Sequence, residues 1–447
     1  MKSRRFFVLT PVIILVLVLM GTLVARAQDV VTITWWTENG DFLQHVQDTF
    51  VKSFNDSHPN IKLELVGQEK LDDVLRTAFQ AGEAPDILQT PGASFIAEYT
   101  ASGQIQPMDS YAEKNGWKDK LLPWAYESGI LDGKLYSLPL TYESMILFYN
   151  KSLFDKNGWT VPTNAADFWA LCQKIADAGI HPFGYSNSEW KPSNEHLLGV
   201  YLNNYLGPDN LYKALTGEKK FTDPEFAEAV QLLTDQITTK GWYSGSLDNY
   251  YAYTNADVFA DLTTGKSAMM ISGTWNFANM KTYFTPDIPD QWDWAPIPMF
   301  KDGVGDYNYE LATGSTLSIN AKSKNVDAAA EVLNYLLSDP KLVLANAAGA
   351  DFGEWMVPLH YGEGDFPEGT DPRIVRYFSD FAKVTGEGRY GYTTWTFWPA
   401  KADVQLWQDI EQVWAGDETV ADYLAAQQAE WDTARADGKT LPIPKRG

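Results

Sequence analysis

Strand-like and helix-like patterns alternate through the first part of this chain, with only short breaks between them. VTITWW (31–36) is strand-like, and DFLQHVQDTFVKSF (41–54) repeats apolar residues at the four-residue spacing of a helix face. IKLELV (61–66) alternates like a half-buried strand, and a helix pattern over 71–81 precedes the short strand DILQ (86–89). This order predicts an α/β fold built on a mostly parallel sheet.

The same alternation returns later, without a repeat or a Ser/Gly-rich linker to mark a domain boundary. In PTNAADFWALCQKIADAG (162–179), Asn164 is the expected N-cap and Gly179 the expected stop. Cys172 falls on the apolar stripe of this helix, which predicts a buried and inert thiol. Further helix patterns lie over 326–340, 404–416 and 419–434. The absence of a clear compositional boundary favours two lobes that share the chain.

The N-terminus carries the pattern of a secretory signal peptide over residues 1–27. Lys2, Arg4 and Arg5 precede an apolar run from 6 to about 24, and Ala-Arg-Ala (25–27) supplies a cleavage pattern. An uncleaved anchor is the alternative, because the run approaches the roughly 20 residues that a bilayer requires. Cys172 is the only cysteine, so there is neither a lipobox nor an intramolecular disulfide, and a large core must stabilise the exported chain.

Composition narrows the classes of partner. The formal net charge is −23, from 35 basic and 58 acidic residues, and such a field repels nucleic acid and anionic membrane surfaces. Aromatic residues make up 14% of the chain, with 17 Trp. Flat rings suit the apolar faces of sugars, although many of these rings must belong to the core.

Three predicted strands end in polar or aromatic residues. In open α/β sheets, ligands bind beyond the carboxyl ends of the strands. The first strand ends at Trp36, Glu38 and Asn39, and the DILQ strand ends at Gln89 and Thr90. In GKSAMMISGTWN (265–276), Gly265 is expected to cap a helix and the apolar stretch to form a buried strand. That strand leaves through Gly273 and Trp275, where the alternative for Trp275 is a packed loop aromatic.

Six segments, taken in order, resemble a known family. They are GEAPDIL (82–88), GKLYSLPLTYESMILFYNKSLFDKNG (133–158), PTNAADFWALCQKI (162–175), GKSAMMISGTWN (265–276), APIPMF (295–300) and GSTLSINAKSKNVDAAAEVLNYLLSDP (314–340). Over essentially the whole body of the chain, this series resembles the extracellular solute-binding proteins of ABC importers. The resemblance is to the carbohydrate-binding group that includes maltose-binding protein.

The resemblance implies a periplasmic-binding-protein-like α/β fold. Each of its two lobes would be a mostly parallel sheet flanked by helices, and a multi-segment hinge would join them around a ligand cleft. We expect lobe 1 to comprise 28–140 with 301–355, and lobe 2 to comprise 141–300 with 356–447. The implied function is the extracytoplasmic substrate-binding component of an ABC sugar importer. It would bind a neutral mono- or oligosaccharide and close to deliver it to the membrane permease.

The resemblance also places ligand-contacting residues. Glu143 lies where the family has a sugar-contacting glutamate, with a hinge carboxylate paired to a base as the alternative. Trp275 matches a stacking tryptophan, whereas Trp36, Glu38 and Asn39 match in location only. The family's charged pair after the DILQ-type strand is missing, which argues against maltose itself. Asp86, at the entry to this strand, is expected to be structural.

Three further aromatic segments are candidates for the same cleft. SNSEWKPSNEH (186–196) contributes Trp190 and Asn194, TTWTFWPA (393–400) contributes Trp395 and Trp398, and FGEWMVPLHYG (352–362) contributes Trp355. Core packing is the open alternative for each of them.

We expect a monomer that contacts permease subunits, binds no nucleic acid and needs no cofactor or metal. No catalytic residue is predicted, because no nucleophile elbow or metal-binding pattern occurs, even among the five His. A secreted glycoside hydrolase is the main alternative, since such enzymes also stack sugars on aromatic rings between two carboxylates. A surface protein that senses or adheres to sugar without feeding an importer is the other alternative.

Overall fold

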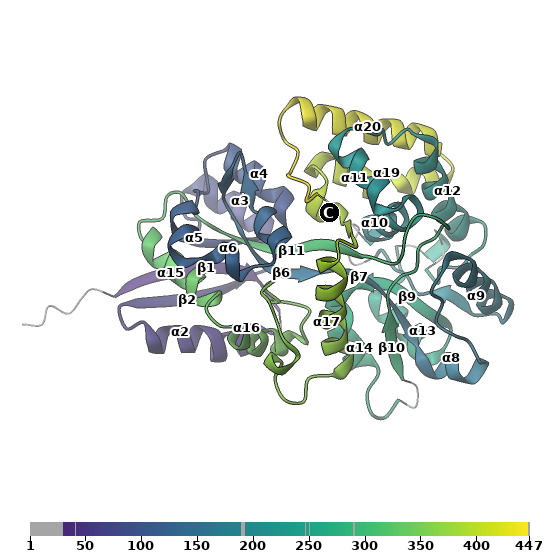
Figure 1. The fold of residues 1–447 in the computed structure, drawn as a ribbon, viewed down its shortest axis with the longest axis horizontal. Coiled ribbons are helices and arrows are strands. Elements are labelled where there is room, and N and C mark those ends of the chain that lie inside the picture. Colours follow the sequence, from purple (N-terminus) through teal and green to yellow (C-terminus); the bar gives the residue numbers. More distant parts are fainter. Residues whose placement is uncertain are drawn as a thin grey trace, which may run out of the picture.

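The protein folds into two α/β lobes that lie side by side (Figure 1). The computed structural model describes residues 30–40, 42–188, 193–245, 247–249, 251–288 and 291–445. Its strands are β1 (Val31–Glu38), β2 (Ile61–Gln68), β3 (Ile87–Thr90), β4 (Ile130–Leu131), β5 (Lys134–Leu135), β6 (Leu138–Glu143), β7 (Met145–Asn150), β8 (His181–Phe183), β9 (Ser267–Gly273), β10 (Trp292–Ala295), β11 (Tyr309–Ile319) and β12 (Tyr390–Tyr392).

Helices cover the sheets of both lobes. They are α1 (Leu43–Val46), α2 (Lys52–Ser57), α3 (Leu71–Ala81), α4 (Ala93–Ala101), α5 (Asp109–Asn115), α6 (Trp117–Lys120), α7 (Pro123–Glu127), α8 (Lys151–Asn157), α9 (Ala165–Asp177), α10 (Ser193–Leu206), α11 (Pro208–Thr216), α12 (Pro224–Thr238), α13 (Asn255–Thr264), α14 (Phe277–Tyr283), α15 (Val326–Leu336), α16 (Pro340–Ala347), α17 (Pro372–Gly386), α18 (Thr394–Phe397), α19 (Ala400–Ala415) and α20 (Val420–Ala436). Short turns of other helix types are η1 (Gln47–Val51), η2 (Leu247–Asn249), η3 (Thr274–Asn276), η4 (Ala348–Ala350) and η5 (Glu363–Asp365).

The sheet of the first lobe starts as the sequence predicts. β1 pairs in parallel with β2 and β3, and β11 then pairs antiparallel with β3. Apolar residues on opposite faces of β1 enter different cores, since Trp35 is fully buried in one while Trp36 packs against another under α3. Both faces of this sheet are therefore covered, which is why β1 carries apolar side chains on both of its sides.

The second sheet departs from the mostly parallel pairing that was expected. β7 lies between β10 and β9 and pairs antiparallel with both, and only β8 and β9 are parallel. The two-lobed α/β architecture is confirmed, but the sheets are mixed. β7 enters its sheet directly from β6 of the other sheet after one residue, whereas β8, β9 and β10 each enter it after a helix and run the opposite way.

β11 joins the two lobes. Its first residues, Tyr309 and Leu311, are buried in the second-lobe core, whereas Leu317 and Ile319 are buried in the first-lobe core. β6 pairs antiparallel with the middle of β11, so the two strands form a ribbon across the centre of the molecule (Figure 1). The lobe boundaries predicted at 140, 300 and 355 stay predictions.

The C-terminal segment also connects the lobes. α20 packs in the second-lobe core through Trp431, and the chain then returns so that Leu441 is buried against α3 and α4 of the first lobe. The hydroxyl of Tyr392 holds this segment by donating to the carbonyl of Pro444 at 2.8 Å. Figure 1 marks the chain end beside the central strands.

Local signals in the sequence produce the expected helix ends. Asn164 caps α9 by accepting a hydrogen bond from the backbone N–H of Asp167 at 2.9 Å. Gly265 ends α13 in the left-handed conformation, at φ 74°, which costs a residue without a Cβ little. Cys172 is buried in the second-lobe core, and burial raises the pKa of its thiol.

Among the described residues, no helix combines the length and apolar character needed to cross a membrane. The predicted signal peptide, residues 1–27, lies outside the part of the chain that the structure describes.

We expect Trp355→Ala to lower the free energy of unfolding by about 3–5 kcal/mol, the usual cost of truncating a large buried aromatic side chain. Trp355 is 1% exposed, and its ring stacks on Trp35 at 4.9 Å in the first-lobe core. Chemical denaturation of the two proteins measures the difference. A loss below about 1 kcal/mol, which is typical of surface substitutions, would contradict this placement.

Candidate functional site

A cavity of about 620 Å³ lies between the two lobes, a size typical of small-molecule sites. The first lobe contributes Glu38, Asp72, Arg76, Pro91, Phe95 and Glu98. The strands and loops near the lobe junction contribute Glu143, Gly314, Glu354 and Trp395. The second lobe contributes Gly184, Tyr185, Ser186, Ser193, Glu195, His196, Leu197, Asn255, Val258, Phe259, Met270, Ile271, Ser272, Trp275, Asn276, Asn279, Ala400, Asp403, Val404 and Trp407.

Three rings meet on one side of the cavity. The ring centroids of Trp275 and Trp395 are 6.0 Å apart, and the two ring planes meet at 73°. The ring centroid of His196 lies 5.0 Å from each of them. Each indole is half-buried and retains surface toward the cavity. Burial lowers the pKa of His196 to about 4, so its imidazole is neutral at neutral pH.

Gly273 makes room for one of these rings. Its backbone is extended, at φ −81° and ψ 162°, so the position does not require glycine for its torsion angles. A Cβ there would lie 2.0 Å from the ring of Trp275. The glycine therefore allows the indole to fold back over the end of β9, and Gly273 itself does not line the cavity.

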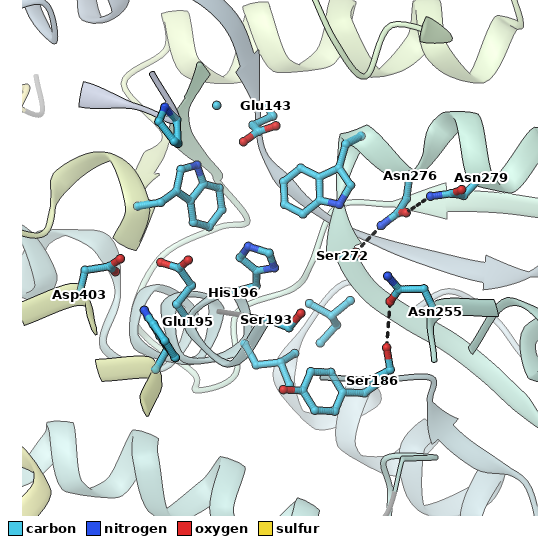
Figure 2. A pocket seen from close by; sticks show the side chains of 18 of the residues that line it. Glu143, Ser186, Ser193, Glu195, His196, Asn255, Ser272, Asn276, Asn279 and Asp403 are labelled. Atoms are coloured by element: carbon cyan, nitrogen blue, oxygen red, sulfur yellow. Dashed lines mark hydrogen bonds between the residues drawn. The ribbon is translucent and has the colours of Figure 1, made fainter. Parts of the chain in front are cut away.

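Glu143 is placed by the ribbon that joins the lobes. It ends β6 opposite Ala312, next to the point where the pairing with β11 shifts register. Its carboxyl group lies against Gly314, and a Cβ on that glycine would come within 2.5 Å of it. Burial raises the pKa of Glu143 to about 8, the charge of Glu38 adds to this, and the nearby Trp395 indole opposes it. Glu143 is 9% exposed and faces the cavity (Figure 2).

Glu195 and Asp403 form a carboxyl pair on the second-lobe wall, pointing toward one another in Figure 2. Burial raises the pKa of both groups, and the charge of Asp403 raises that of Glu195 further. A hydrogen bond between two carboxyl groups requires one proton, so the pair holds a proton between its members. Thr394 orients the pair by donating to Oε2 of Glu195 at 2.8 Å.

Glu354 reaches the cavity from a strained loop. Asp351, Phe352 and Trp355 all have positive φ, between 45° and 63°, although none is glycine. Such conformations are concentrated at functional sites. Burial raises the pKa of Glu354 well above its ordinary value, and the charges of Glu38 and Glu143 raise it further.

The first-lobe wall carries the one Lys or Arg among the described residues that line the cavity. Arg76 on α3 approaches Glu98 at 3.7 Å, and both are largely exposed. Burial raises the pKa of Asp72 to about 6, with a contribution from the charge of Glu38 and an opposing one from Arg76. The side chain of Glu38 retains exposed surface at the end of β1, and its partial removal from water raises its pKa as well.

Neutral polar groups occupy the remaining wall. Asn276 donates to Ser272 at 2.6 Å and accepts from Asn279 at 2.7 Å, and Ser186 donates to Asn255 at 2.8 Å (Figure 2). Amide and hydroxyl groups of this kind can both donate to and accept from hydroxyl groups of a ligand.

The structure brings Glu38, Glu143, Trp275 and Trp395 together around one cavity, as the sequence predicts. Three other residues predicted at strand ends do not line it. Asn39 donates to Glu69 at 2.7 Å on the surface, Gln89 accepts from Thr37, and Thr90 shares a hydrogen bond of 2.6 Å with Thr316.

Four more predicted residues also lie away from the cavity. Trp36 packs against the cluster under α3, and Trp355 stacks on Trp35 in the first-lobe core. Trp398 is fully buried against Trp431, at 5.8 Å. Asn194 supports the cavity indirectly, because it accepts a hydrogen bond from Tyr185 and donates to the carbonyl of Trp407 at 3.0 Å. Trp190 lies outside the described residues.

Several cavity residues were missed although their segments had been singled out. Glu195 and His196 end the segment chosen for Trp190 and Asn194, and Glu354 immediately precedes Trp355. The only sequence signal for Glu354 is its position directly beside an aromatic residue. Asp72 and Arg76 lie within the helix pattern over 71–81, and Asp403 directly precedes the one over 404–416; neither pattern carries a distinguishing motif.

Asp86 has the structural role predicted for it. Its carboxylate accepts from the backbone and side chain of Thr34 at 2.9 and 3.1 Å, and from Ser323 at 2.6 Å. It thereby ties β1 to the segment after β11.

The carboxyl groups of the cavity do not form a metal site. Within the described residues, no group of three or more His, Cys, Asp or Glu side chains is arranged to hold a metal ion.

We expect Glu143→Gln to change how stability depends on pH. In the unfolded chain Glu143 ionises near 4.5, whereas the folded protein keeps its proton up to about pH 8. Between these values the folded state binds more protons, so the free energy of unfolding falls as pH rises. The substitution should remove up to about 1.4 kcal/mol per pH unit of that fall. Denaturation at several pH values measures the slope, and an unchanged slope would contradict a buried, protonated Glu143.

Comparison with known proteins agrees with this architecture. Residues 35–341 match the family described as bacterial extracellular solute-binding protein. An uncharacterised ABC transporter extracellular-binding protein of Pyrococcus horikoshii is 24% identical over 320 residues, 70% of this chain and 68% of that protein. A multiple sugar-binding protein of Streptococcus mutans is 23% identical over 320 residues, 69% and 71% of the two chains.

Solved structures show the same fold. A chitin oligosaccharide binding protein superposes with a TM-score of 0.74 at 20% identity, covering 91% of this chain and all of that one. The sugar-binding protein MalE of Xanthomonas citri superposes with a TM-score of 0.70 at 21% identity, covering 91% and 98%. With more than half of its length matched and a ligand-sized cavity between two lobes, this chain belongs to the family of bacterial extracellular solute-binding proteins.

Proposed function

We propose that the protein is the substrate-binding component of an ABC sugar importer. It holds a mono- or oligosaccharide without anionic groups in the cavity between its lobes and delivers it to permease subunits in the membrane. The single observation that carries this proposal is the combination of half-buried indoles with carboxyl, amide and hydroxyl groups around one cavity. Indole faces stack on the apolar faces of sugar rings, and the polar groups bind hydroxyl groups in the ring plane.

Closure of the lobes couples binding to delivery. Residues from both lobes line the cavity, so a ligand that touches both stabilises the closed arrangement more than an open one. The β6–β11 ribbon and the C-terminal segment, with the loop that carries Glu354, form the hinge in this proposal. We retain the predicted lobes, 28–140 with 301–355 and 141–300 with 356–447, as part of it.

The protein acts outside the cytoplasm in this proposal, exported by the signal peptide at 1–27, and it works as a monomer. The extracellular family and a net charge of −23 support these assignments, and the charge also argues against nucleic acid as a partner. Names of relatives such as the multiple sugar-binding protein support the class of ligand.

The Glu195–Asp403 pair raises the question of glycoside hydrolysis, because it is a carboxyl pair with raised pKa inside the cavity. Hydrolases hold their two carboxyl groups roughly 5–9.5 Å apart, on either side of the bond to be cleaved. Glu195 and Asp403 share a hydrogen bond, which leaves no space for a glycosidic bond between them. This pair therefore lacks the geometry of a hydrolase, and the family of binding proteins to which the chain belongs supports our proposal of binding without catalysis. Oligosaccharide incubated with the protein should yield no new reducing ends, and their appearance would overturn this part of the proposal.

We expect Trp275→Ala to weaken sugar binding at least about tenfold, which corresponds to about 1.4 kcal/mol, while changing the melting temperature little. The ring is half-buried and borders the cavity, so its removal takes away a stacking surface and little core. Calorimetric titration with a panel of sugars measures affinity, and a thermal scan measures stability.

Trp355→Ala is the matched control, since it removes a tryptophan that is buried in the first-lobe core and away from the cavity. It should cost stability far more than affinity. A Trp275→Ala variant with a lower melting temperature and unchanged affinity would show that Trp275 is a core residue and does not contact the ligand. Absence of binding across the whole panel would overturn the proposed function.

A further inference from the structure

Charge in the cavity is strongly unbalanced. Seven carboxyl groups line it, from Glu38, Asp72, Glu98, Glu143, Glu195, Glu354 and Asp403, against the single guanidinium of Arg76 among the described residues. Arg76 is already paired with Glu98 at the rim. Arg76 also acts on Asp72, which lies on the same helix, and the remaining five acidic groups face the cavity without a Lys or Arg among the described residues that line it.

The electrostatic effects of these carboxyl groups overlap. The charge of Glu38 acts on Asp72, Glu143 and Glu354, and the charge of Glu143 acts in turn on Glu195 and Glu354. Asp403 joins this set through its hydrogen bond with Glu195. A cation placed in the cavity would be attracted by several of these groups at once.

Hydrogen-bond donors are also missing. Oδ1 of Asp72 in the first lobe is buried and accepts no hydrogen bond, and on the second-lobe wall the partner of Asp403 is another carboxyl group, that of Glu195. A buried acceptor without a donor is costly, so a bound ligand is the natural source of donors. The nearby rings of Trp275, Trp395 and His196 are uncharged and supply aromatic surface, on which a cation is stabilised by the ring electrons.

We propose that the preferred ligand is a sugar that carries a protonated amine, bound with its ammonium group among Glu143, Glu195 and the two indoles. This inference rests on the proposed sugar-binding function and replaces the neutral ligand expected from the sequence with a cationic one. Hydroxyl groups of a neutral sugar could supply donors to the carboxyl groups. Only a positive charge also favours the ionised forms of Glu143 and Glu195, so these groups give up their protons as the ammonium group binds. Figure 2 shows Glu143 and Glu195 on two sides of the space next to His196.

Three sugars that differ only in the substituent on one carbon of each ring, in two chain lengths, test this inference. Glucosamine, N-acetylglucosamine and glucose, each as the monosaccharide and as the β-1,4-linked trimer, are titrated calorimetrically at about pH 6, below the pKa of the amine. We expect the amine form to bind at least about tenfold more tightly than both uncharged forms, a difference of about 1.4 kcal/mol. Added salt should reduce this preference by screening.

Glu143→Gln and Glu195→Gln should each weaken binding of the amine form several-fold more than they weaken binding of the uncharged sugars. Two separate variants keep the test decisive if one of them fails to fold, which a thermal scan reveals. Glu228→Gln is the matched control, because it removes an exposed carboxylate that pairs with Lys301 outside the cavity. The Glu228→Gln variant should prefer the amine form to the same extent as the unaltered protein.

Equal or weaker binding of the amine form would overturn this inference and leave the sugar-binding function intact. Binding of spermidine with no response to any sugar would overturn both, and so would silence toward all probes.

Discussion

The β6–β11 ribbon is the element on which the rest of the molecule depends. β11 contributes apolar residues to both cores, so neither lobe is complete without it. Relative motion of the lobes must therefore bend or twist this ribbon, and the irregular pairing around Gly314 is a place where it can do so. Glu143 and Gly314 lie at its register shift, where the carboxyl group occupies the space that a glycine leaves open. The ribbon thus joins the lobes and also places the central carboxyl group of the cavity.

The cavity combines groups that a stable interior would avoid. Buried carboxyl groups repel one another, and each is stabilised only by a proton, a donor or a cation. Glu143 keeps its proton to about pH 8, and Glu195 shares one with Asp403. The strained backbone at 351–355 adds to this cost. A ligand that supplies hydrogen-bond donors and positive charge would lower the free-energy cost of these buried carboxyl groups. Its binding would thereby favour the closed arrangement of the lobes.

Sequence patterns located the functional segments more accurately than the functional residues. Glu354 lies beside Trp355, and Trp395 precedes Trp398 by three positions, yet in each pair only one residue reaches the cavity. Trp355 has a positive φ, and Trp398 directly follows the four-residue helix that holds Trp395, so no regular periodicity indicates which side chain faces the cavity. Composition cannot distinguish the faces, because an aromatic ring serves a core as well as a ligand. Glu143 and Trp275 were placed by the family motif, whose spacing encodes the face.

The sequence by itself determined the two-lobed α/β class, the capped helices such as α9 and α13, and the family to which the chain belongs. These properties follow from local periodicity, cap chemistry and motif order, all of which act over short stretches of chain. Only the tertiary structure decided that the second sheet is mixed and that α3, α10 and α19 bring Asp72, Glu195 and Asp403 to one cavity. Electrostatic coupling depends on distance in space, and residues more than 300 positions apart carry no local sign that they will meet.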